Sequence, residues 1–299
     1  MKIVAVIVTY NAMKWVDRCM QSLRNSFIPV VPVVVDNGSI DGTRDYLPAH
    51  YPEAIFLPQD ENLGFGQANN VGLRYAKEQE ADYALLLNQD AWIDAQMLVQ
   101  LLRFSDGHSL LSPIQLNGQG TDFDRNFNQN TILRSSDITS LMDLKSGGYS
   151  RPFEAVAAAA ACWLIPREII FNVGGFNPLF FQYGEDHNYL DRVFFHGYKL
   201  KVVPTAFMCH DRKQFGHPQL YQRQIVYRYL LLRATDINCR PSLVPLLRIC
   251  GFWCREGLKH RRFLHFLCQS ISGMVRLFFN REEIRKSRET EQIFQSSWL

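Results

Sequence analysis

Short apolar runs of strand length alternate with segments of helical period through the first 210 residues of the chain. The first two runs are rich in β-branched residues, which predicts strands buried on both faces, as in a parallel sheet. Between them, Trp15, Cys19, Met20 and Leu23 recur at helical spacing, so this segment is predicted to form a β-α-β unit. The strands expected on this basis cover residues 2–8, 30–35, 54–57, 83–87, 156–165 and 200–203.

Helices are expected between these runs. A polar, glycine-containing loop at 37–43 opens one of them, and others cover 66–77, 94–104, 167–173 and 186–195. Strand and helix thus alternate, which predicts an α/β fold with a doubly wound, mostly parallel sheet flanked by helices. Residues 114–152 interrupt this alternation. They are rich in Asn, Gln, Asp and Gly, and indicate a substrate-side excursion or a mobile loop.

The charge of the chain changes sign near Asp211. Residues 1–211 contain 16 Lys and Arg against 23 Asp and Glu, whereas residues 212–299 contain 16 against 6. The net charge of +3 therefore combines an acidic first part with a basic second part that is predicted to be helical, and we place an organisational boundary between them. With 47% apolar residues in 299, the chain can build one large domain or two small ones.

Polar side chains stand at the ends of three predicted strands. Thr9 follows the first strand and Asp36 the second, and Asp90 follows the run at 83–87 through Asn88. A carboxylate at the end of a buried strand is a poor packing choice but a good ligand for a hard cation. Ligands of open α/β sheets bind beyond the carboxyl ends of the strands, which makes Asp90 a candidate site residue. Capping of the next helix is the alternative role for Asp90.

Four segments of the chain together carry a family resemblance. In chain order they are VIVTYN at 6–11, VVDNGS at 34–39, NLGFGQANN at 62–70, and VGGF at 173–176 leading to GED at 184–186. They resemble the successive signatures of glycosyltransferase family 2, and the resemblance covers residues 2–210. It implies a nucleotide-diphosphosugar transferase fold of the GT-A type. The implied organisation is a catalytic domain over 1–211, with a nucleotide-binding half (1–113) and an acceptor half (114–211), and a basic helical C-terminal region over 212–299.

The resemblance also implies a nucleoside pocket at the strand ends. Thr9 and the backbone beside it would line this pocket, and Asp36 would accept hydrogen bonds from the base or ribose, unless it only forms the turn before Gly38. Asn62 and Asn70 flank a glycine-containing turn into a helix, where their amides would reach the nucleoside or fix the loop. The residues expected to bind the nucleotide sugar are Thr9, Tyr10, Asn11, Asp36, Asn37, Gly38, Asn62, Gly64, Asn70 and Asn88.

A divalent cation, Mg²⁺ or Mn²⁺, is expected to bridge Asp90 and the donor diphosphate, because the charge of the leaving group needs a counter-charge. The sequence departs here from the family's Asp-x-Asp pattern, since Asn88 stands in place of the first carboxylate. The metal should therefore bind weakly in the absence of nucleotide. His210 resembles the histidine that some relatives place beside the metal. An exposed loop histidine without a role is the alternative.

Asp186 is the expected general base. It would accept the proton of an acceptor hydroxyl while that oxygen attacks the anomeric carbon opposite the departing nucleotide, which gives inversion. Glu185 is the alternative base, and both carboxylates could instead only complement the N-terminus of the predicted helix. Relatives often carry another acidic residue two positions later, where this chain has Asn188. That difference concerns the positioning of the acceptor more than the base.

The seven cysteines form no CxxC pair, and no secretory signal precedes the first strand, so reduced thiols and a cytoplasmic location are expected. Cys250, Cys254, His260 and His265 do not have the spacing of common zinc sites, and buried thiols on helices are expected instead. No run of 18 or more apolar residues occurs, so no membrane-spanning segment is expected.

Aromatic and aliphatic residues are interleaved with arginines over residues 241–280. This composition is typical of helices that lie on an anionic membrane surface. The alternative is an ordinary helical subdomain that packs on the core or on a second copy of the chain, which would give a homo-oligomer. Nucleic acid is not expected as a partner, because the sequence has no recognisable binding module and the part that carries the motifs is acidic.

Together these features predict an inverting hexosyltransferase of bacterial surface polysaccharide assembly, such as O-antigen or capsule, resembling the rhamnosyltransferases of the family. The donor would be dTDP-rhamnose or a UDP-sugar. The acceptor would be a growing, lipid-linked glycan at the inner face of the cell membrane, where the protein would bind peripherally. One alternative is a non-catalytic protein of this fold that binds sugar nucleotides or membranes. The other, a dinucleotide-dependent oxidoreductase, needs GxGxxG where the chain has Thr9-Tyr10-Asn11.

Overall fold

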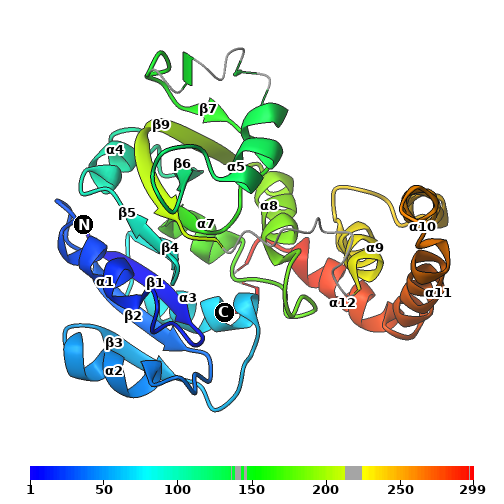
Figure 1. Cartoon of the computed structure of the whole chain (residues 1–299), viewed down its shortest axis with the longest axis horizontal. Helices are drawn as coiled ribbons and strands as arrows, with labels where there is room; N and C mark the ends of the chain where they lie inside the picture. The colour runs from blue at the N-terminus through cyan, green and yellow to red at the C-terminus, as the bar shows by residue number, and fades with distance from the viewer. Residues whose placement is uncertain (136, 139–142, 145–146, 213–223, 296) are drawn as a thin grey trace.

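A central β-sheet with helices on both faces forms the larger part of the molecule, and the C-terminal helices extend from it to one side (Figure 1). The computed structural model describes residues 1–135, 137–138, 143–144, 147–212, 224–295 and 297–299. In these residues no helix is both long and apolar enough to cross a membrane. The α/β prediction and the helical character of the C-terminal region are both confirmed.

The strand order of the sheet is β3-β2-β1-β4-β8-β6-β9-β5, and β7 pairs with β9. β1 is parallel to β2 and β4, and β2 to β3, so this part of the sheet is parallel as predicted. Beyond β4 the sheet is mixed, because β8 is antiparallel to both β4 and β6 whereas β6 and β9 are parallel. The strands are β1 (Ile3–Thr9), β2 (Val31–Asp36), β3 (Ile55–Pro58), β4 (Tyr83–Asn88), β5 (Ala91–Ile93), β6 (Ser109–Asn117), β7 (Phe153–Glu154), β8 (Cys162–Pro166) and β9 (Lys199–His210).

Helices cover both faces of the sheet, which is why its strands are apolar on both faces. Along β1, Val4 and Val6 face the layer that contains α3, whereas Ile3 and Ile7 face the layer that contains α1. Gly72 of α3 lets that helix lie against the strand, since a Cβ there would be 2.2 Å from Val6 Cγ1. The helices of this part are α1 (Val16–Arg24), α2 (Thr43–His50), α3 (Phe65–Glu78), α4 (Met97–Arg103), α5 (Arg125–Asn130), α7 (Arg167–Asn172) and α8 (Glu185–Phe195).

Two strand predictions are wrong in their bounds. The Ala-rich run at 156–165 forms a strand only from Cys162 onward, and the small residues before it pack as irregular chain. The last strand of the core does not end at residue 203. It continues to His210 through a bulge, where its pairing with β6 shifts between Pro113 and Ile114. Pro204 lies in this irregular stretch, and because proline usually marks the end or an irregularity of a strand, the strand was not expected to resume.

The region predicted as an irregular excursion, 114–152, contains more structure than expected. It begins with the end of β6, a strand missed because Ser112 and Gln115 interrupt its apolar pattern. Both side chains are buried with hydrogen bonds to backbone carbonyls, from Ser112 to Pro113 and from Gln115 to Ala159. α5 and a 3₁₀ turn at Ile132–Arg134 follow. The rest of the prediction falls partly on residues 136, 139–142 and 145–146, outside the described residues.

The C-terminal region forms its own small apolar core and then returns to the sheet domain. Phe180, Val226, Trp253 and Phe266 are among the buried residues of this core. The last helix brings Glu291 against Arg192 of α8, with both side chains at most 1% exposed. The helices of this region are α9 (Ile225–Thr235), α10 (Leu243–Lys259), α11 (Phe263–Phe279) and α12 (Arg281–Glu291). Residues 213–223, next to the predicted boundary, lie outside the described part of the chain.

Candidate active site

The carboxyl ends of β1 and β2 bring Thr9 and Asp36 together, as neighbours in the parallel ladder. The Thr9 hydroxyl donates to Asp36 Oδ1 at 3.0 Å, and the Ser39 backbone N–H donates to Oδ2 at 3.2 Å. Both Thr9 and Asp36 are fully buried. Their side chains fix the turn after β2 and present no exposed surface of their own.

Hydrogen bonds tie the loop after β1 to the segments that follow β4 and β2. Gln89 accepts a hydrogen bond from the Tyr10 backbone N–H at 2.7 Å and donates to the Tyr10 carbonyl at 3.2 Å. Asn11, whose φ is +52°, accepts from the Ile40 N–H at 2.9 Å. The Tyr10 side chain itself remains 44% exposed. Gln89 was not predicted as a site residue, although its position between Asn88 and Asp90 placed it at the same strand end.

Asn37 and Asn62 tie the turn after β2 to the segment that enters α3. Asn37 Nδ2 donates to Asn62 Oδ1 at 3.0 Å, and Asn62 Oδ1 also accepts from the Gly64 N–H at 2.9 Å. Gly38 and Gly64 both have a φ of +82°. At Gly64 a Cβ would lie 2.1 Å from the Phe181 carbonyl oxygen, so the chain requires glycine there. This close approach joins the predicted nucleotide side of the site to the loop before α8.

Asn70 holds a loop rather than facing open space. Its Nδ2 donates to the Phe176 carbonyl at 2.8 Å, and its Oδ1 accepts from the Phe176 N–H at 2.6 Å. The residue is 5% exposed, and Gly175 packs against it so closely that a Cβ would lie 2.4 Å from Asn70 Oδ1. Of the two roles that the sequence left open for Asn70, the structure describes the one that fixes the loop.

Asp90 and His210 are adjacent beyond the end of β4. His210 Nε2 lies 3.2 Å from Asp90 Oδ1 and 3.5 Å from Asn88 Nδ2. His210 pairs with Ala91 across β5 and β9 and is 3% exposed, so the alternative of an exposed loop histidine is wrong. It is buried because β9 extends beyond its bulge. A neutral imidazole nitrogen cannot both accept from an Asn amide and donate to a carboxylate, so one of these contacts is unsatisfied.

These residues fit a hard divalent cation. Two neighbouring ligands of an octahedral Mg²⁺ lie about 3 Å apart, close to the separation of Asp90 Oδ1 and His210 Nε2. Asn88 Oδ1 is buried without a hydrogen-bond partner in the structure, as is His210 Nδ1. Within the described residues no cluster of three or more His, Cys, Asp or Glu side chains could hold a metal alone. Asp90 and His210, with the Asn88 oxygen beside them, are the side chains that would hold such an ion, and a diphosphate would have to supply the other ligands.

Glu185 and Asp186 begin α8, directly after the left-handed Gly184 at φ +104°. Burial raises the pKa of the Glu185 carboxyl, and the negative charge of Asp186 raises it further. Burial acts on Asp186 in the same direction, but hydrogen bonds and charge from His187 outweigh it and lower the Asp186 pKa. Both described hydrogen bonds to Asp186 reach Oδ1, from the His187 backbone N–H at 2.9 Å and from Nδ1 at 3.0 Å. Of the two carboxyls, Asp186 is the one held as a carboxylate.

Arg212 acts electrostatically on Asp186. It lies two residues beyond His210, and its positive charge contributes to the lowered Asp186 pKa. Its Nε lies 3.7 Å from Asp124 Oδ2. His187 and Arg212 were missed by sequence reasoning. His187 follows Asp186 directly, which was a usable signal, whereas the position of Arg212 depends on the path of β9 and had none.

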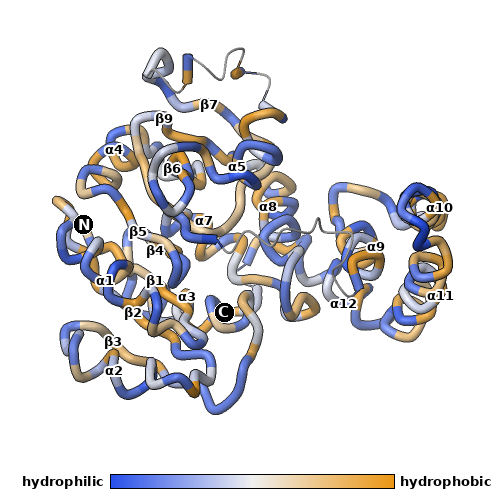
Figure 2. The backbone as a smooth tube through the Cα atoms, in the orientation of Figure 1, coloured by the Kyte–Doolittle hydropathy of each residue, from blue (hydrophilic) through white to orange (hydrophobic). Residues whose placement is uncertain are grey.

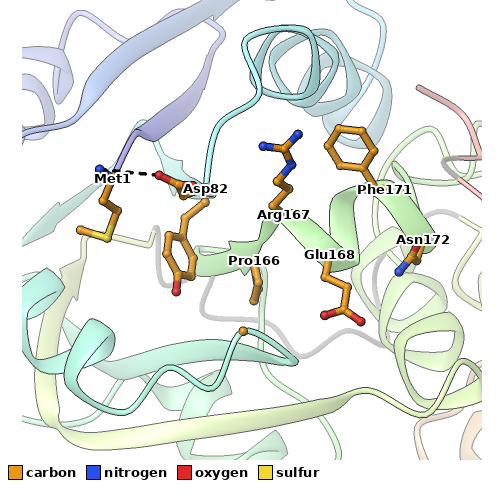
Figure 3. Close-up of a pocket in the computed structure, with 9 residues that line it drawn as sticks. Met1, Asp82, Pro166, Arg167, Glu168, Phe171 and Asn172 are labelled. Atoms are coloured by element: carbon orange, nitrogen blue, oxygen red, sulfur yellow. Dashed lines mark ion pairs between the residues drawn. The ribbon is translucent and has the colours of Figure 1, made fainter.

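A separate open pocket lies at the opposite edge of the sheet (Figure 3). It has a volume of about 760 Å³, and the residues around it include Met1, Asp82, Arg167 and Phe171. This edge holds the amino ends of β1 and β4, so the pocket is remote from Thr9, Asp36 and Asn88 at the carboxyl ends. The Met1 amino group lies 3.8 Å from Asp82, and Arg167 lies 3.4 Å from Glu80. None of the predicted site residues lines it.

The fold is that of a GT-A glycosyltransferase. The family model "Glycosyl transferase family 2" matches residues 4–172, and the chain belongs to this family. It is similar to N-acetylglucosaminyl-diphospho-decaprenol L-rhamnosyltransferase of Mycobacterium tuberculosis, with 27% identity over 69% of this chain and 75% of that protein. It is also similar to the dTDP-rhamnosyl transferase RfbF of Shigella flexneri, with 23% identity over 82% of each.

Solved structures share this fold at low sequence identity. The S. aureus TarS 1–349 structure in complex with UDP superposes with a TM-score of 0.57 at 15% identity, over 98% of this chain and 90% of that one. The mannosyltransferase PcManGT from Pyrobaculum calidifontis, in complex with GDP-Man and Mn²⁺, gives a TM-score of 0.55 at 15% identity, over 97% and 84%. The chain is therefore a glycosyltransferase enzyme with rhamnosyltransferase-like relatives, which excludes the oxidoreductase and non-catalytic alternatives.

Proposed function

We propose that the protein transfers a sugar, with inversion, from a nucleotide-diphosphosugar to a hydroxyl of a lipid-linked glycan acceptor. Two observations support this proposal. Asp90 and His210 are in contact at the carboxyl edge of the sheet. Asp186, at the start of α8, is held as a carboxylate, and the positive charge of Arg212, two residues beyond His210, acts on it. Such a pair of centres can accept a proton from a nucleophile and offset the charge of a leaving diphosphate.

Asp186 is the proposed general base, and Glu185 is the weaker candidate. A base must be ionised before it can accept a proton, and the raised pKa of Glu185 favours its protonated form. The lowered pKa of Asp186 favours the carboxylate, with His187 fixing Oδ1. A base placed on the acceptor side and opposite the leaving group gives a single displacement, hence inversion at the anomeric carbon.

Asp90 and His210 are the proposed ligands of Mg²⁺ or Mn²⁺, shared with the donor diphosphate. The cation supplies the positive charge against which the nucleoside diphosphate departs. Asn88 lies in the position where a second carboxylate would strengthen the site, so donor and metal are expected to bind together. The Mn²⁺ in the PcManGT complex supports this choice of ion class.

The ends of β1 and β2, with the Asn37–Asn62 contact, are the proposed nucleoside side of the site. The names of the two relatives support dTDP-rhamnose as the donor and a polyprenyl-diphosphate-linked acceptor, and the UDP in the TarS structure supports a UDP-sugar as the second donor class. Assembly of a bacterial surface polysaccharide at the inner face of the cell membrane, by a peripherally bound cytoplasmic enzyme, is the corresponding setting.

The test is transfer by the purified full chain from a panel of dTDP- and UDP-sugars to a polyprenyl-diphosphate glycan, with Mn²⁺ present. We expect one donor to be used, with inverted anomeric configuration in the product by NMR. Asp186→Asn should lower kcat by roughly 10³-fold or more without weakening donor binding, while Glu185→Gln retains activity. Retained configuration, or full activity in Asp186→Asn, would overturn the mechanism, and no transfer from any donor would overturn the substrate class.

A further inference from the structure

The hairpin of α10 and α11 exposes an unusual amount of apolar side chain. On α10, the exposed fractions of Leu243, Val244, Leu247 and Leu258 lie between 54% and 63%. On α11, Leu264, Ile271, Val275, Phe278 and Phe279 are between 47% and 76% exposed. The hairpin is nevertheless well packed inside, since Trp253 stacks on Phe266 with ring centroids 5.4 Å apart. The outward apolar residues are therefore additional to the residues of the buried core. Figure 2 shows hydrophobic and hydrophilic positions interspersed along α10 and α11.

These exposed residues form a stripe along each helix. At about 100° per residue, the five exposed residues of α11, including Phe279, fall within an arc of about 100°. The four exposed leucine and valine residues of α10 also fall within an arc of about 100°. Phe252 and Phe263, which are 54% and 37% exposed, lie outside these two arcs. We call the nine residues within the arcs on α10 and α11 the hairpin face.

Positive charge surrounds the hairpin face. Arg248, Arg255 and Lys259 are exposed on α10, next to its apolar stripe in the helical projection. Glu256 is the only acidic residue between positions 240 and 281, and its carboxylate is paired with Lys259. The same stretch of sequence contains eight Lys and Arg residues, all of them exposed: Arg240, Arg248, Arg255, Lys259, Arg261, Arg262, Arg276 and Arg281.

We propose that the hairpin face docks the enzyme onto an anionic lipid bilayer, with α10 and α11 lying in the interface. Apolar side chains flanked by cations match the layering of acyl chains below anionic headgroups. A second copy of the chain would bring two equally basic surfaces together, which charge repulsion opposes. Charge complementarity therefore selects the membrane as the occupant.

The docking surface lies one helix away from the candidate active site. α9 packs on both α10 and α11, and its Arg228 lies over the ring of Tyr183, 5.5 Å from the centroid. Tyr183 belongs to the loop that opens α8, where Glu185 and Asp186 begin. Docking through the hairpin face would hold this end of the catalytic domain near the bilayer, where a lipid-linked acceptor resides. The docking itself does not depend on the proposed transfer reaction.

Vesicle co-sedimentation of the full chain, without donor or acceptor, tests the proposal. We expect binding to vesicles of phosphatidylglycerol and phosphatidylcholine, and at least roughly tenfold weaker partition onto phosphatidylcholine alone. Leu264→Ser/Ile271→Ser/Phe278→Ser and Arg248→Glu/Arg255→Glu should each lower partition onto anionic vesicles by a similar factor. Equal binding to both vesicle types, or unchanged binding of both variants, would overturn the proposal.

Matched controls separate the hairpin face from general effects of charge and hydrophobicity. Arg74→Glu/Arg103→Glu changes the net charge by the same amount on exposed residues of α3 and α4, and Phe27→Ser removes a side chain that is 64% exposed elsewhere. Both should bind vesicles like the wild type. Light scattering without vesicles measures the mass of each protein, and unchanged thermal unfolding shows that it is folded. If the serine variant converts a dimer into a monomer and the wild type binds no vesicles, the hairpin face is a self-association surface and the proposal is wrong.

Discussion

His210 Nε2 lies 3.2 Å from Asp90 Oδ1, although 120 residues separate them along the chain. The contact exists because β9 continues past a bulge and pairs with β5, which starts directly after Asp90. The pair stands at the carboxyl edge of the sheet, where the ends of β1, β2 and β4 also meet. Both residues were candidates in the sequence, and their contact is the basis for the metal site that we propose.

Replacement of His210 should weaken the binding of the metal ion without first altering the fold. We expect His210→Gln to raise the Mn²⁺ concentration needed for half-maximal transfer by roughly 10- to 100-fold. A chelator should abolish transfer by the wild type, because Asp90 and His210 alone hold the ion weakly. His50→Gln, on the exposed end of α2, is the control and should leave the Mn²⁺ dependence unchanged. Activity that survives chelation would contradict a metal role for Asp90 and His210.

Glu185 should make the stability of the protein depend on pH. Its pKa is raised in the folded state, so above the ordinary carboxyl range the native protein keeps a proton that the unfolded chain loses. Wild-type stability should therefore fall, by at most about 1.4 kcal/mol per pH unit, as pH rises from the unfolded pKa to the folded one. Glu185→Gln has no carboxyl group at this position, so its stability should not fall with rising pH for this reason.

The measurement for Glu185 is urea unfolding of both proteins at several pH values. The stability advantage of Glu185→Gln over the wild type should grow as pH rises and level off above the raised pKa. Glu78→Gln, at the end of α3, should show no such trend relative to the wild type. A difference between Glu185→Gln and wild type that stays constant with pH would refute the raised pKa of Glu185.

Asn70 should matter more for stability than its neighbour Asn69. Asn70→Ala removes two hydrogen bonds and leaves the buried N–H and C=O of Phe176 without partners, which should cost about 2–4 kcal/mol. Asn69→Ala removes one bond within α3, from Nδ2 to the Phe65 carbonyl, and should cost less. Denaturant titration of the two variants compares them. Equal losses would show that the loop before α8 does not depend on Asn70.

The ion pair of Arg192 and Glu291 should fasten α12 to the catalytic domain. The nearest charged atoms are 3.6 Å apart and both side chains are buried, so Arg192→Met or Glu291→Gln alone leaves one charge uncompensated. Each single change should cost about 3–5 kcal/mol, and the double variant should cost clearly less than the sum. The exposed pair of Arg285 and Glu289 is the control, and its removal should cost far less because solvent screens the two charges. Strict additivity at Arg192 and Glu291 would contradict the coupling.

The local pattern of the chain predicted most elements of the fold and most of the candidate site. The helices and the parallel strands around β1 followed from periodicity, since each buries its own face regardless of partners. β6 was missed because Ser112 and Gln115 interrupt its apolar pattern, and Gln115 is buried there through a hydrogen bond to Ala159, which lies 44 positions away. For the same reason the sequence left two roles open for Asn70, and only its contact with Phe176 distinguishes them.

The sequence by itself determined the alternation of strands and helices, the family motifs, and the placement of Asp36, Asp90 and Asp186 at strand and helix ends. Those features depend on side-chain periodicity and on turn chemistry, which act over a few residues. Only the tertiary structure shows that His210 contacts Asp90 directly and that Glu291 forms an ion pair with Arg192. It alone also shows that the charge of Arg212 lowers the pKa of Asp186. Strand pairing and helix packing bring together residues that are far apart in the sequence, 120 positions in the case of Asp90 and His210. No local pattern encodes which of them will be in contact.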